Sequence, residues 1–292
     1  MAWSWAIYLY LWMAGMAGGA FFAAFLAERF AGLNNNKLLK LSTYFGVPLA
    51  IIGVILLIVE LGQPLRFWHL FTEFDAASPM SLGTWILLVW IVIAVVMVIL
   101  WWAQNNILKG MSGTVGSLIK LLGWIELIFS VLVIAYTGVL LAVSGQPLWA
   151  STAFLPALFV ASAVSTGVAL LILTSSIGRS IPNRIIGRLA EADAIVIGIE
   201  LLVLIGYVIW MAISGMMGAG DALSVLISGT LAVPFWLGVV LVAVLIPLGL
   251  EITNWGKDLE RKGVWRAIMA SSACVILGGL VLRAVMVVGG QL

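Results

Sequence analysis

Eight apolar runs, each long enough to cross a lipid bilayer as a helix, constrain this chain more than any other feature. A membrane-spanning helix needs about 20 predominantly apolar residues. No stretch between the runs resembles a soluble domain or a long linker. We therefore expect an all-α integral membrane protein, a bundle of eight transmembrane helices that forms a single domain over residues 1–292. The runs lie near residues 5–27, 41–61, 82–103, 119–143, 153–175, 193–214, 231–250 and 267–288.

The composition excludes soluble folds and several classes of cofactor site. The protein is 64% hydrophobic and 9% charged, whereas soluble domains have about 45–50% apolar and about 25% charged residues. One cysteine, Cys274, and one histidine, His69, are too few for an iron–sulfur cluster, a cysteine-rich zinc site or a pair of haem ligands. We expect no haem, no metal bound by this protein and no nucleic-acid partner. Nucleotide-binding glycine loops and nucleophile motifs are also missing from the sequence.

The distribution of basic residues predicts the orientation in the membrane. Positive charge gathers in loops on the cytoplasmic side. Here 12 of the 14 basic residues lie in alternate loops, the first, third, fifth and seventh. The two others are Arg66, in the second loop, and Arg283, inside the last run. Both termini are therefore expected on the outer side of a bacterial or archaeal cytoplasmic (inner) membrane.

Two local features predict helix packing and helix ends. Gly15, Gly18 and Gly19 in the first run suit a close approach of two helices in lipid. The sequence Gly-Gln-Pro-Leu occurs at 62–65 and again at 145–148, each time at the outer end of an apolar run. Gly followed by Pro stops a helix and turns the backbone. The two copies are either two similar helix ends or two rims of one pocket.

Five hydrogen-bonding residues from different segments are expected to share the outer third of the membrane. Ionisable groups inside a bilayer are costly and are functional candidates by default. Polar groups that converge in an apolar surround form a site for an amphipathic small molecule. The alternative is that Glu60 pairs with Arg283 only to stabilise the bundle, while His69 lies idle at the interface. The five residues are Tyr10, Glu60, His69, Tyr136 and Arg283.

A quinone has the chemistry that such a site would accept. It needs hydrogen-bond donors for two carbonyl oxygens and an apolar slot for its ring and tail. Its reduction takes up two electrons and two protons, so titratable groups must lie nearby. Tyr and His side chains can donate to a carbonyl, and a carboxyl group such as that of Glu60 can exchange protons.

A second set of acids lies deeper, toward the cytoplasm. Glu126 is expected about two turns into the fourth run, while Asp193 and Glu200 open the sixth and Glu251 closes the seventh. Buried acids in series suggest a proton relay, with Glu126, Asp193 and Glu200 as its members. Alternatively, Asp193 and the neighbouring Glu191 face the lipid headgroups.

Several motifs together resemble the NrfD/polysulfide reductase membrane-subunit family. They are Glu60-Leu-Gly-Gln-Pro-Leu-Arg-Phe-Trp-His69, Ser78-Pro-Met-Ser-Leu-Gly-Thr-Trp85, Tyr136-Thr-Gly with Gln146-Pro-Leu-Trp149, and the ending from Leu282 to Gln291. The resemblance covers nearly the whole sequence. It implies an eight-helix protein without haem that holds menaquinone or ubiquinone near the outer face.

The resemblance also implies partners and residue roles. An iron–sulfur subunit with four clusters would dock on the outer face and serve a catalytic subunit, in some cases a molybdopterin enzyme. Tyr136 matches the quinone-contacting Tyr of the family, Glu60 the acid beside it, and His69 a loop His of some members. Tyr10 stands where polysulfide reductase-like members have His. The family acid is often Asp followed by Gly-Arg-Pro, whereas here Glu60 is followed by Leu-Gly-Gln-Pro.

The favoured hypothesis is a quinone-reactive membrane anchor that is not an enzyme by itself. It would pass electrons between the quinone pool and the iron–sulfur partner, with proton transfer as a coupled step. The alternatives are an ion- or proton-translocating subunit or transporter without quinone chemistry, and a purely structural anchor.

Overall fold

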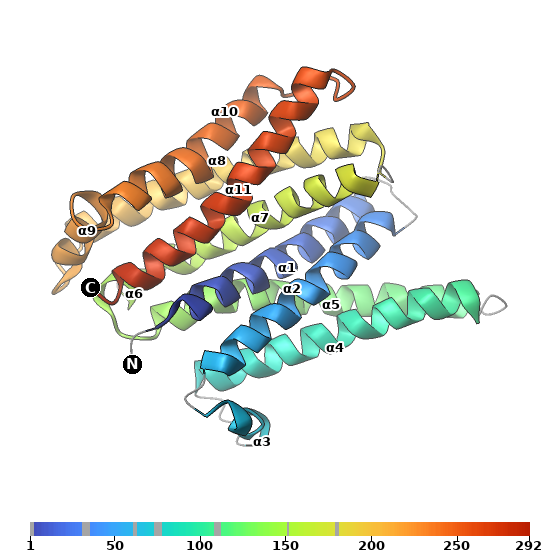
Figure 1. Ribbon diagram of the computed structural model, residues 1–292, viewed down its shortest axis with the longest axis horizontal. Helices are drawn as coiled ribbons and strands as arrows, with labels where there is room; N and C mark the ends of the chain where they lie inside the picture. Colours follow the sequence, from blue (N-terminus) through green and yellow to red (C-terminus); the bar gives the residue numbers. More distant parts are fainter. Residues whose placement is uncertain are drawn as a thin grey trace.

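The computed structural model confirms the eight-helix expectation (Figure 1). It describes residues 3–30, 36–60, 63–72, 78–107, 112–150, 152–178 and 181–292. Eight helical spans within these residues are long and apolar enough to cross a membrane. They are α1 (Trp5–Phe30), α2 (Lys37–Glu60), α4 (Pro79–Asn106), α5 (Ser112–Ala142), α7 (Phe154–Gly178), α8 (Asn183–Ile213), η3 (Pro234–Leu245) continued by α10 (Ile246–Thr253), and α11 (Lys262–Gly289).

The remaining helices are short and lie at one end of the bundle, the end that also holds both termini (Figure 1). They are η1 (Pro64–Arg66), α3 (His69–Thr72), α6 (Pro147–Ala150) and α9 (Ala219–Ile227). Trp3 and Gln291 tie the two termini together, because the Gln291 amide donates to the Trp3 carbonyl at 3.1 Å and accepts from the Trp3 N–H. The termini therefore share one end, as an even number of spans requires. That this end faces outward stays a prediction.

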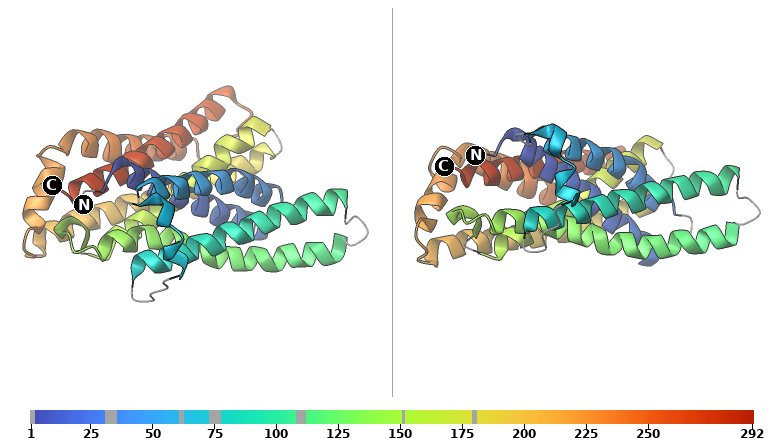
Figure 2. Two further views of the ribbon diagram at one scale, coloured as in Figure 1. Left: turned by 60° about the horizontal axis from the view of Figure 1, so that its bottom comes forward. Right: turned by 90° about the horizontal axis from the view of Figure 1, so that it is seen from below.

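Several helices begin earlier than the apolar runs that predicted them. The largest difference is in α8, which begins at Asn183 instead of near residue 193. The residues added include Arg184, Arg188 and Glu191, which are too polar for the hydrocarbon. Backbone hydrogen bonding continues through them because a helix need not end where the apolar layer ends. At the same end, α4 and α5 project together beyond their neighbours (Figure 2).

The eight spans form two groups of four. In the first group α1 contacts α2 and α5, and α4 contacts both α2 and α5. In the second group α7 and α11 contact one another, and α8, η3 and α10 complete the packing. The pair α1 and α7 joins the groups, and these two helices are the most buried spans. The core of the protein therefore lies along α1 and α7.

Glycine permits the close crossing of α1 and α7. A β-carbon on Gly19 would overlap the backbone of Ala163, and one on Gly167 would overlap the backbone of Gly19 and Ala20. Small residues at a crossing bring helix backbones together, which is how helices associate in lipid without a hydrophobic driving force between them. The expected role of Gly19 in helix packing is confirmed.

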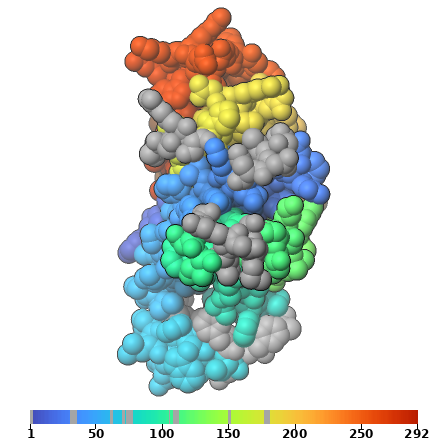
Figure 3. Space-filling model, turned by 90° about the vertical axis from the view of Figure 1, so that its right-hand side faces the viewer, coloured from blue at the N-terminus to red at the C-terminus, as the bar shows by residue number. Residues whose placement is uncertain are grey.

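Basic residues gather at the end of the bundle opposite the termini. Arg29 lies in the last turn of α1, Lys37 opens α2, and Lys262 opens α11. Arg184 and Arg188 lie in the first turns of α8. Figure 3 looks onto this end, with the connection between α10 and α11 at the top. Two of the basic residues counted above, Lys109 and Arg179, lie outside the described residues.

Candidate functional site

A cavity of about 370 Å³ opens between α2 and α4, toward the end that holds the termini. We call it the tyrosine cavity, because Tyr10 of α1 and Tyr136 of α5 bring two phenols to an otherwise almost wholly apolar lining. Such a lining suits an amphipathic molecule that is mostly carbon and has few polar atoms. The other lining residues are Ile51, Val54, Ile55, Leu57 and Ile58 of α2, Phe67 between η1 and α3, Met80, Thr84, Leu87, Leu88 and Ile91 of α4, and Leu140 of α5.

The two tyrosines lie near one another and are placed by glycines. Tyr10 reaches the cavity from α1 and Tyr136 reaches it from α5. A β-carbon on Gly83 of α4 would overlap the Tyr136 ring, and one on Gly53 of α2 would lie 3.3 Å from Cδ2 of Tyr10. Each phenol therefore occupies space that a facing glycine leaves open. The Thr84 hydroxyl, also in the lining, donates to the Met80 carbonyl at 2.9 Å and so is engaged within its own helix.

Glu60 and His69 lie beside the tyrosine cavity rather than in its lining. Glu60 is the last residue of α2, two residues beyond the lining residue Ile58, and its side chain is half-buried. His69 opens α3, and its ring stacks on that of Trp68 with centroids 3.8 Å apart. Phe67 is the residue that this connection contributes to the lining. The proposed roles of Glu60 and His69 in ligand binding stay predictions.

Arg283 lies on α11 in the second helix group, whereas Glu60 lies on α2 in the first. Its guanidinium is fully buried and donates to the Leu11 carbonyl at 3.3 Å, the Ser162 hydroxyl at 3.3 Å and the Gly279 carbonyl at 2.9 Å. It also lies over the Phe159 ring, 5.5 Å from the centroid. Leu11 follows Tyr10 in α1, so Arg283 contacts the backbone directly beside the tyrosine cavity without lining it.

Arg283 begins a buried charge cluster formed by Arg283, Glu200, Asp193 and Glu251 from α11, α8 and α10. Glu200 interacts electrostatically with Arg283, and Asp193 with both Glu200 and Glu251. The cluster therefore runs from beside the tyrosine cavity toward the basic end of the bundle.

Serine hydroxyls accompany the buried charge cluster. Ser162 contacts both Arg283 and Glu200, and Ser271 donates to the Glu251 carboxyl at 2.8 Å. Ser165 interacts with the Asp193 carboxyl without reaching full hydrogen-bond geometry. These serines were not among the predicted site residues, because a serine within an apolar run does not by itself indicate a functional site.

Glu126 stands apart from this cluster. Its side chain is fully buried on α5, in the first helix group, and neither carboxyl oxygen has a hydrogen-bond partner among the described residues. The sequence grouped Glu126 with Asp193 and Glu200 because all three are acids inside apolar runs. The structure places the last two together and Glu126 in a different group of helices.

The two Gly-Gln-Pro-Leu copies have different surroundings. Residues 63–66 are exposed, next to the Phe67 side of the tyrosine cavity. In the second copy Leu148 is buried and its carbonyl accepts from the Tyr207 hydroxyl at 2.9 Å. Trp149, which follows it, donates to the Met286 carbonyl at 2.6 Å. The second copy anchors α6 and does not form a rim of the tyrosine cavity.

The described residues contain no group of three or more His, Cys, Asp or Glu side chains that would hold a metal ion. The cavity, the buried charge cluster and the eight spans therefore define a polytopic membrane protein whose notable groups are phenols, carboxyls and one guanidinium. With these observations, comparison with known proteins gives the family. The protein belongs to the NrfD family, because the family model described as polysulphide reductase, NrfD, matches residues 1–292.

Three relatives are similar over the whole length of this protein. The C subunit of polysulfide reductase from Wolinella succinogenes is 29% identical, with 100% of this protein and 95% of that relative covered. Protein NrfD of Escherichia coli is 27% identical, with 100% and 96% covered. The NrfD homolog of Haemophilus influenzae is 27% identical, with 100% and 95% covered. The resemblance seen in the sequence motifs is thereby confirmed.

Proposed function

We propose that this protein is the quinone- or quinol-reactive membrane subunit of a respiratory oxidoreductase complex. The observation that carries the proposal is the tyrosine cavity, in which Tyr10 and Tyr136 share an otherwise almost wholly apolar lining. Family membership supports it, since a relative covered over nearly its full length is named as the C subunit of polysulfide reductase, and hence as one part of a larger enzyme.

The residues of the tyrosine cavity fit a quinone. Two phenol hydroxyls are donors for carbonyl oxygens, and the side chains of α2 and α4 provide apolar walls for a ring and an isoprenoid tail. When bound, menaquinone or ubiquinone would supply the two-electron, two-proton chemistry that no side chain here possesses. The protein's own part is to bind and orient this molecule, exclude water from it and hold protons near it. Glu60 and His69, at the cavity's edge, are the proposed groups for proton exchange.

The electrons would come from, or go to, an iron–sulfur subunit on the outer face, which in turn serves a catalytic, for example molybdopterin, subunit. We place the end with the termini, α3 and the tyrosine cavity on the outer side of a bacterial or archaeal inner membrane. This orientation is supported by the basic residues of α8 and α11, which lie at the opposite end.

Substitution of Tyr136 by Phe tests the proposal. The change removes one donor and keeps the ring, so quinone-linked electron transfer by the assembled complex should fall about tenfold, the value of one lost hydrogen bond to a polar ligand atom. Tyr44→Phe is the matched control, because Tyr44 is exposed and does not line the cavity. Stopped-flow oxidation of a short-chain naphthoquinol measures the rate, and co-purification of the partner subunits measures assembly. Wild-type rates in an assembled Tyr136→Phe complex would refute quinone binding at this cavity.

The buried charge cluster favours a second candidate function, proton or ion translocation without quinone chemistry. Ionisable groups inside a membrane protein commonly mark ion and proton paths. Here Glu200 and Asp193 interact with one another and, at either end of the cluster, with Arg283 and Glu251. In the coupled version of our proposal the same groups carry protons from the basic end toward the tyrosine cavity.

A further inference from the structure

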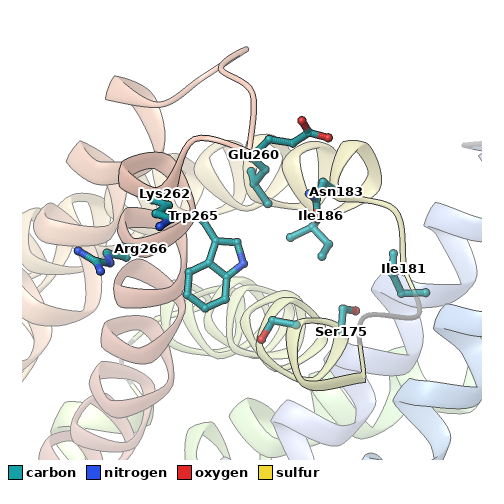
Figure 4. A pocket seen from close by; sticks show the side chains of 10 residues that line it. Ser175, Ile181, Asn183, Ile186, Glu260, Lys262, Trp265 and Arg266 are labelled. Atoms are coloured by element: carbon teal, nitrogen blue, oxygen red, sulfur yellow. The ribbon is translucent and has the colours of Figure 1, made fainter.

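A second, larger cavity lies at the basic end of the bundle, remote from the tyrosine cavity. It has a volume of about 850 Å³ and is bounded by the end of α7 and the first turns of α8 and α11 (Figure 4). We call it the α8–α11 cavity. Its lining includes Ser175 of α7, Asn183 and Ile186 of α8, and Lys262 and Trp265 of α11. None of these residues has a part in the function proposed above.

Ser175 gives this cavity a buried hydrogen-bonding group without a partner. Its side chain is 1% exposed, and its hydroxyl makes no hydrogen bond within the described part of the protein. An unsatisfied buried hydroxyl costs about 1–3 kcal/mol, so such groups are normally paired. The adjacent Ser176 also lines the cavity, but its hydroxyl donates to the Leu173 carbonyl at 2.6 Å. Of these two lining serines, Ser175 is therefore the one whose hydroxyl has no hydrogen-bond partner among the described residues.

Two helix N-termini bound the same cavity and neither is capped by a side chain. The N-cap residues are Pro182 for α8 and Arg261 for α11, and neither side chain bonds to the first turn. By contrast, the first turn of α2 is capped by the Glu28 carboxyl, which accepts from the Leu38 N–H at 2.6 Å. Free N–H groups and the positive end of the helix dipole attract anions. Two such ends at one cavity, together with the Ser175 hydroxyl, favour a negatively charged ligand.

The side chains around the α8–α11 cavity agree with an anion that also has apolar parts. Figure 4 shows the Trp265 indole reaching into the hollow, while the Glu260 carboxylate points outward over α8. Lys262 lies at the edge, at the start of α11, and Arg266 points away along the outside of that helix. Ile181, Ile186 and Leu259 supply buried apolar walls.

We propose that the α8–α11 cavity binds the phosphate headgroup of an anionic phospholipid. Basic pockets between transmembrane helices on the cytoplasmic side hold such headgroups, and the indole of Trp265 suits the membrane interface. The ligand phosphate accepts from the Ser175 hydroxyl and from the first N–H groups of α8 and α11, with Lys262 as its counter-charge. The glycerol and the start of the acyl chains lie against the apolar walls. The proposal does not depend on the quinone function.

The test is a lipid titration of the purified full-length protein in mixed micelles. Rising mole fractions of dioleoylphosphatidylglycerol should raise the melting temperature in a saturable way, and dioleoylphosphatidylcholine should not, because binding to the folded state stabilises it. Ser175→Ala and Lys262→Gln should each weaken the apparent affinity about tenfold, the effect of one lost charge-assisted hydrogen bond or ion pair.

Ser176→Ala is the matched control and should behave as the wild type, since that hydroxyl is already bonded within α7. Without phosphatidylglycerol, Ser175→Ala should melt no lower than the wild type, because it removes a group that has no partner among the described residues. A purely structural role for Ser175 would lower the melting temperature in every lipid. Equal responses of Ser175→Ala and Ser176→Ala, or equal effects of the two lipids, would overturn the proposal. So would a saturable shift from inorganic phosphate that matches the effect of the lipid.

Discussion

Gly83 and Tyr136 show at the residue scale how the tyrosine cavity is built. Gly83 belongs to the Ser78–Trp85 motif through which the sequence resembled its family. The Tyr136 ring fills the space where a side chain at position 83 would lie. Glycine at position 83 of the motif therefore allows the Tyr136 ring of α5 to pack against the backbone of α4.

Gly83→Ala is expected to displace the Tyr136 ring and weaken quinone binding. A methyl group at position 83 overlaps the ring, which must rotate or move away. We expect a rise of about tenfold in the Michaelis constant for a short-chain naphthoquinol, with a smaller change in the maximal rate. Steady-state kinetics of the assembled complex would show this split.

Gly198→Ala on α8 is the control for this substitution, because a β-carbon there meets open space. In a Tyr136→Ala background Gly83→Ala should have no further effect, since the ring that it displaces is gone. Additive effects of the two substitutions would mean that Gly83 does not act through Tyr136.

Residue types alone indicated part of this site. A tyrosine or an acid within an apolar run is conspicuous, so Tyr10, Tyr136, Glu60 and Arg283 were all candidates. The tertiary structure divides these candidates between two places. Tyr10 and Tyr136 share a cavity, whereas Arg283 bonds to Ser162 and Gly279 in the other helix group. The isoleucines and leucines of α2 and α4 could not be foreseen as cavity lining, since every span is rich in them.

At the scale of elements, α1 and α7 hold the two groups of helices together. Their crossing depends on Gly19 and Gly167, whose missing side chains let the two backbones approach. Helices in lipid gain stability from such close packing, because lipid tails are as apolar as the side chains they would replace. This crossing also positions Tyr10, which lies in α1 about two and a half turns before Gly19.

Gly19→Val is expected to destabilise the protein by about 1–3 kcal/mol, the usual cost of overpacking a tight contact. The valine side chain would overlap the Ala163 backbone and force α1 and α7 apart. Thermal unfolding in detergent, followed by the accessibility of Cys274 to a thiol-reactive dye, measures the loss. Gly198→Val, where the added atoms meet open space, should change the midpoint much less. Equal midpoints for the two variants would show that the crossing does not depend on Gly19.

Helix ends were less predictable than helix centres. The hydropathy pattern locates the part of each helix that lies in hydrocarbon. It does not indicate polar helical turns that continue beyond the hydrocarbon. The early start of α8 at Asn183 follows from this difference. It matters for function, because the polar first turns of α8 and α11 form the walls of the α8–α11 cavity.

At the scale of the whole molecule, the buried charge cluster connects two distant regions. It begins at Arg283, which bonds to the carbonyl next to Tyr10, and it continues through Glu200 and Asp193 to Glu251 near the end of α10. We propose that protons moving from the basic end to the tyrosine cavity pass along this cluster. Glu126 lies outside it.

Glu200→Gln is expected to slow proton uptake from the basic side about tenfold or more, because the amide cannot release and rebind a proton. Oriented proteoliposomes that carry the complex and an internal pH dye measure this uptake. Glu126→Gln is the matched control, the same substitution at a buried acid of the other helix group, and it should leave uptake unchanged. The opposite pattern would place the route through α5. Loss of uptake with intact quinone turnover would favour translocation as a separate activity.

The sequence by itself determined the number of spans, the membrane environment, the family and the residue types available for chemistry. These properties depend on apolar length and local motifs, which a linear pattern records. Only the tertiary structure decided which polar groups meet. Tyr10 and Tyr136 line one cavity, where Gly53 and Gly83 leave room for their rings, and Glu200 joins Asp193 while Glu126 does not. In an all-helical membrane protein every span is apolar on most sides, so the sequence cannot state which faces of which helices will be neighbours.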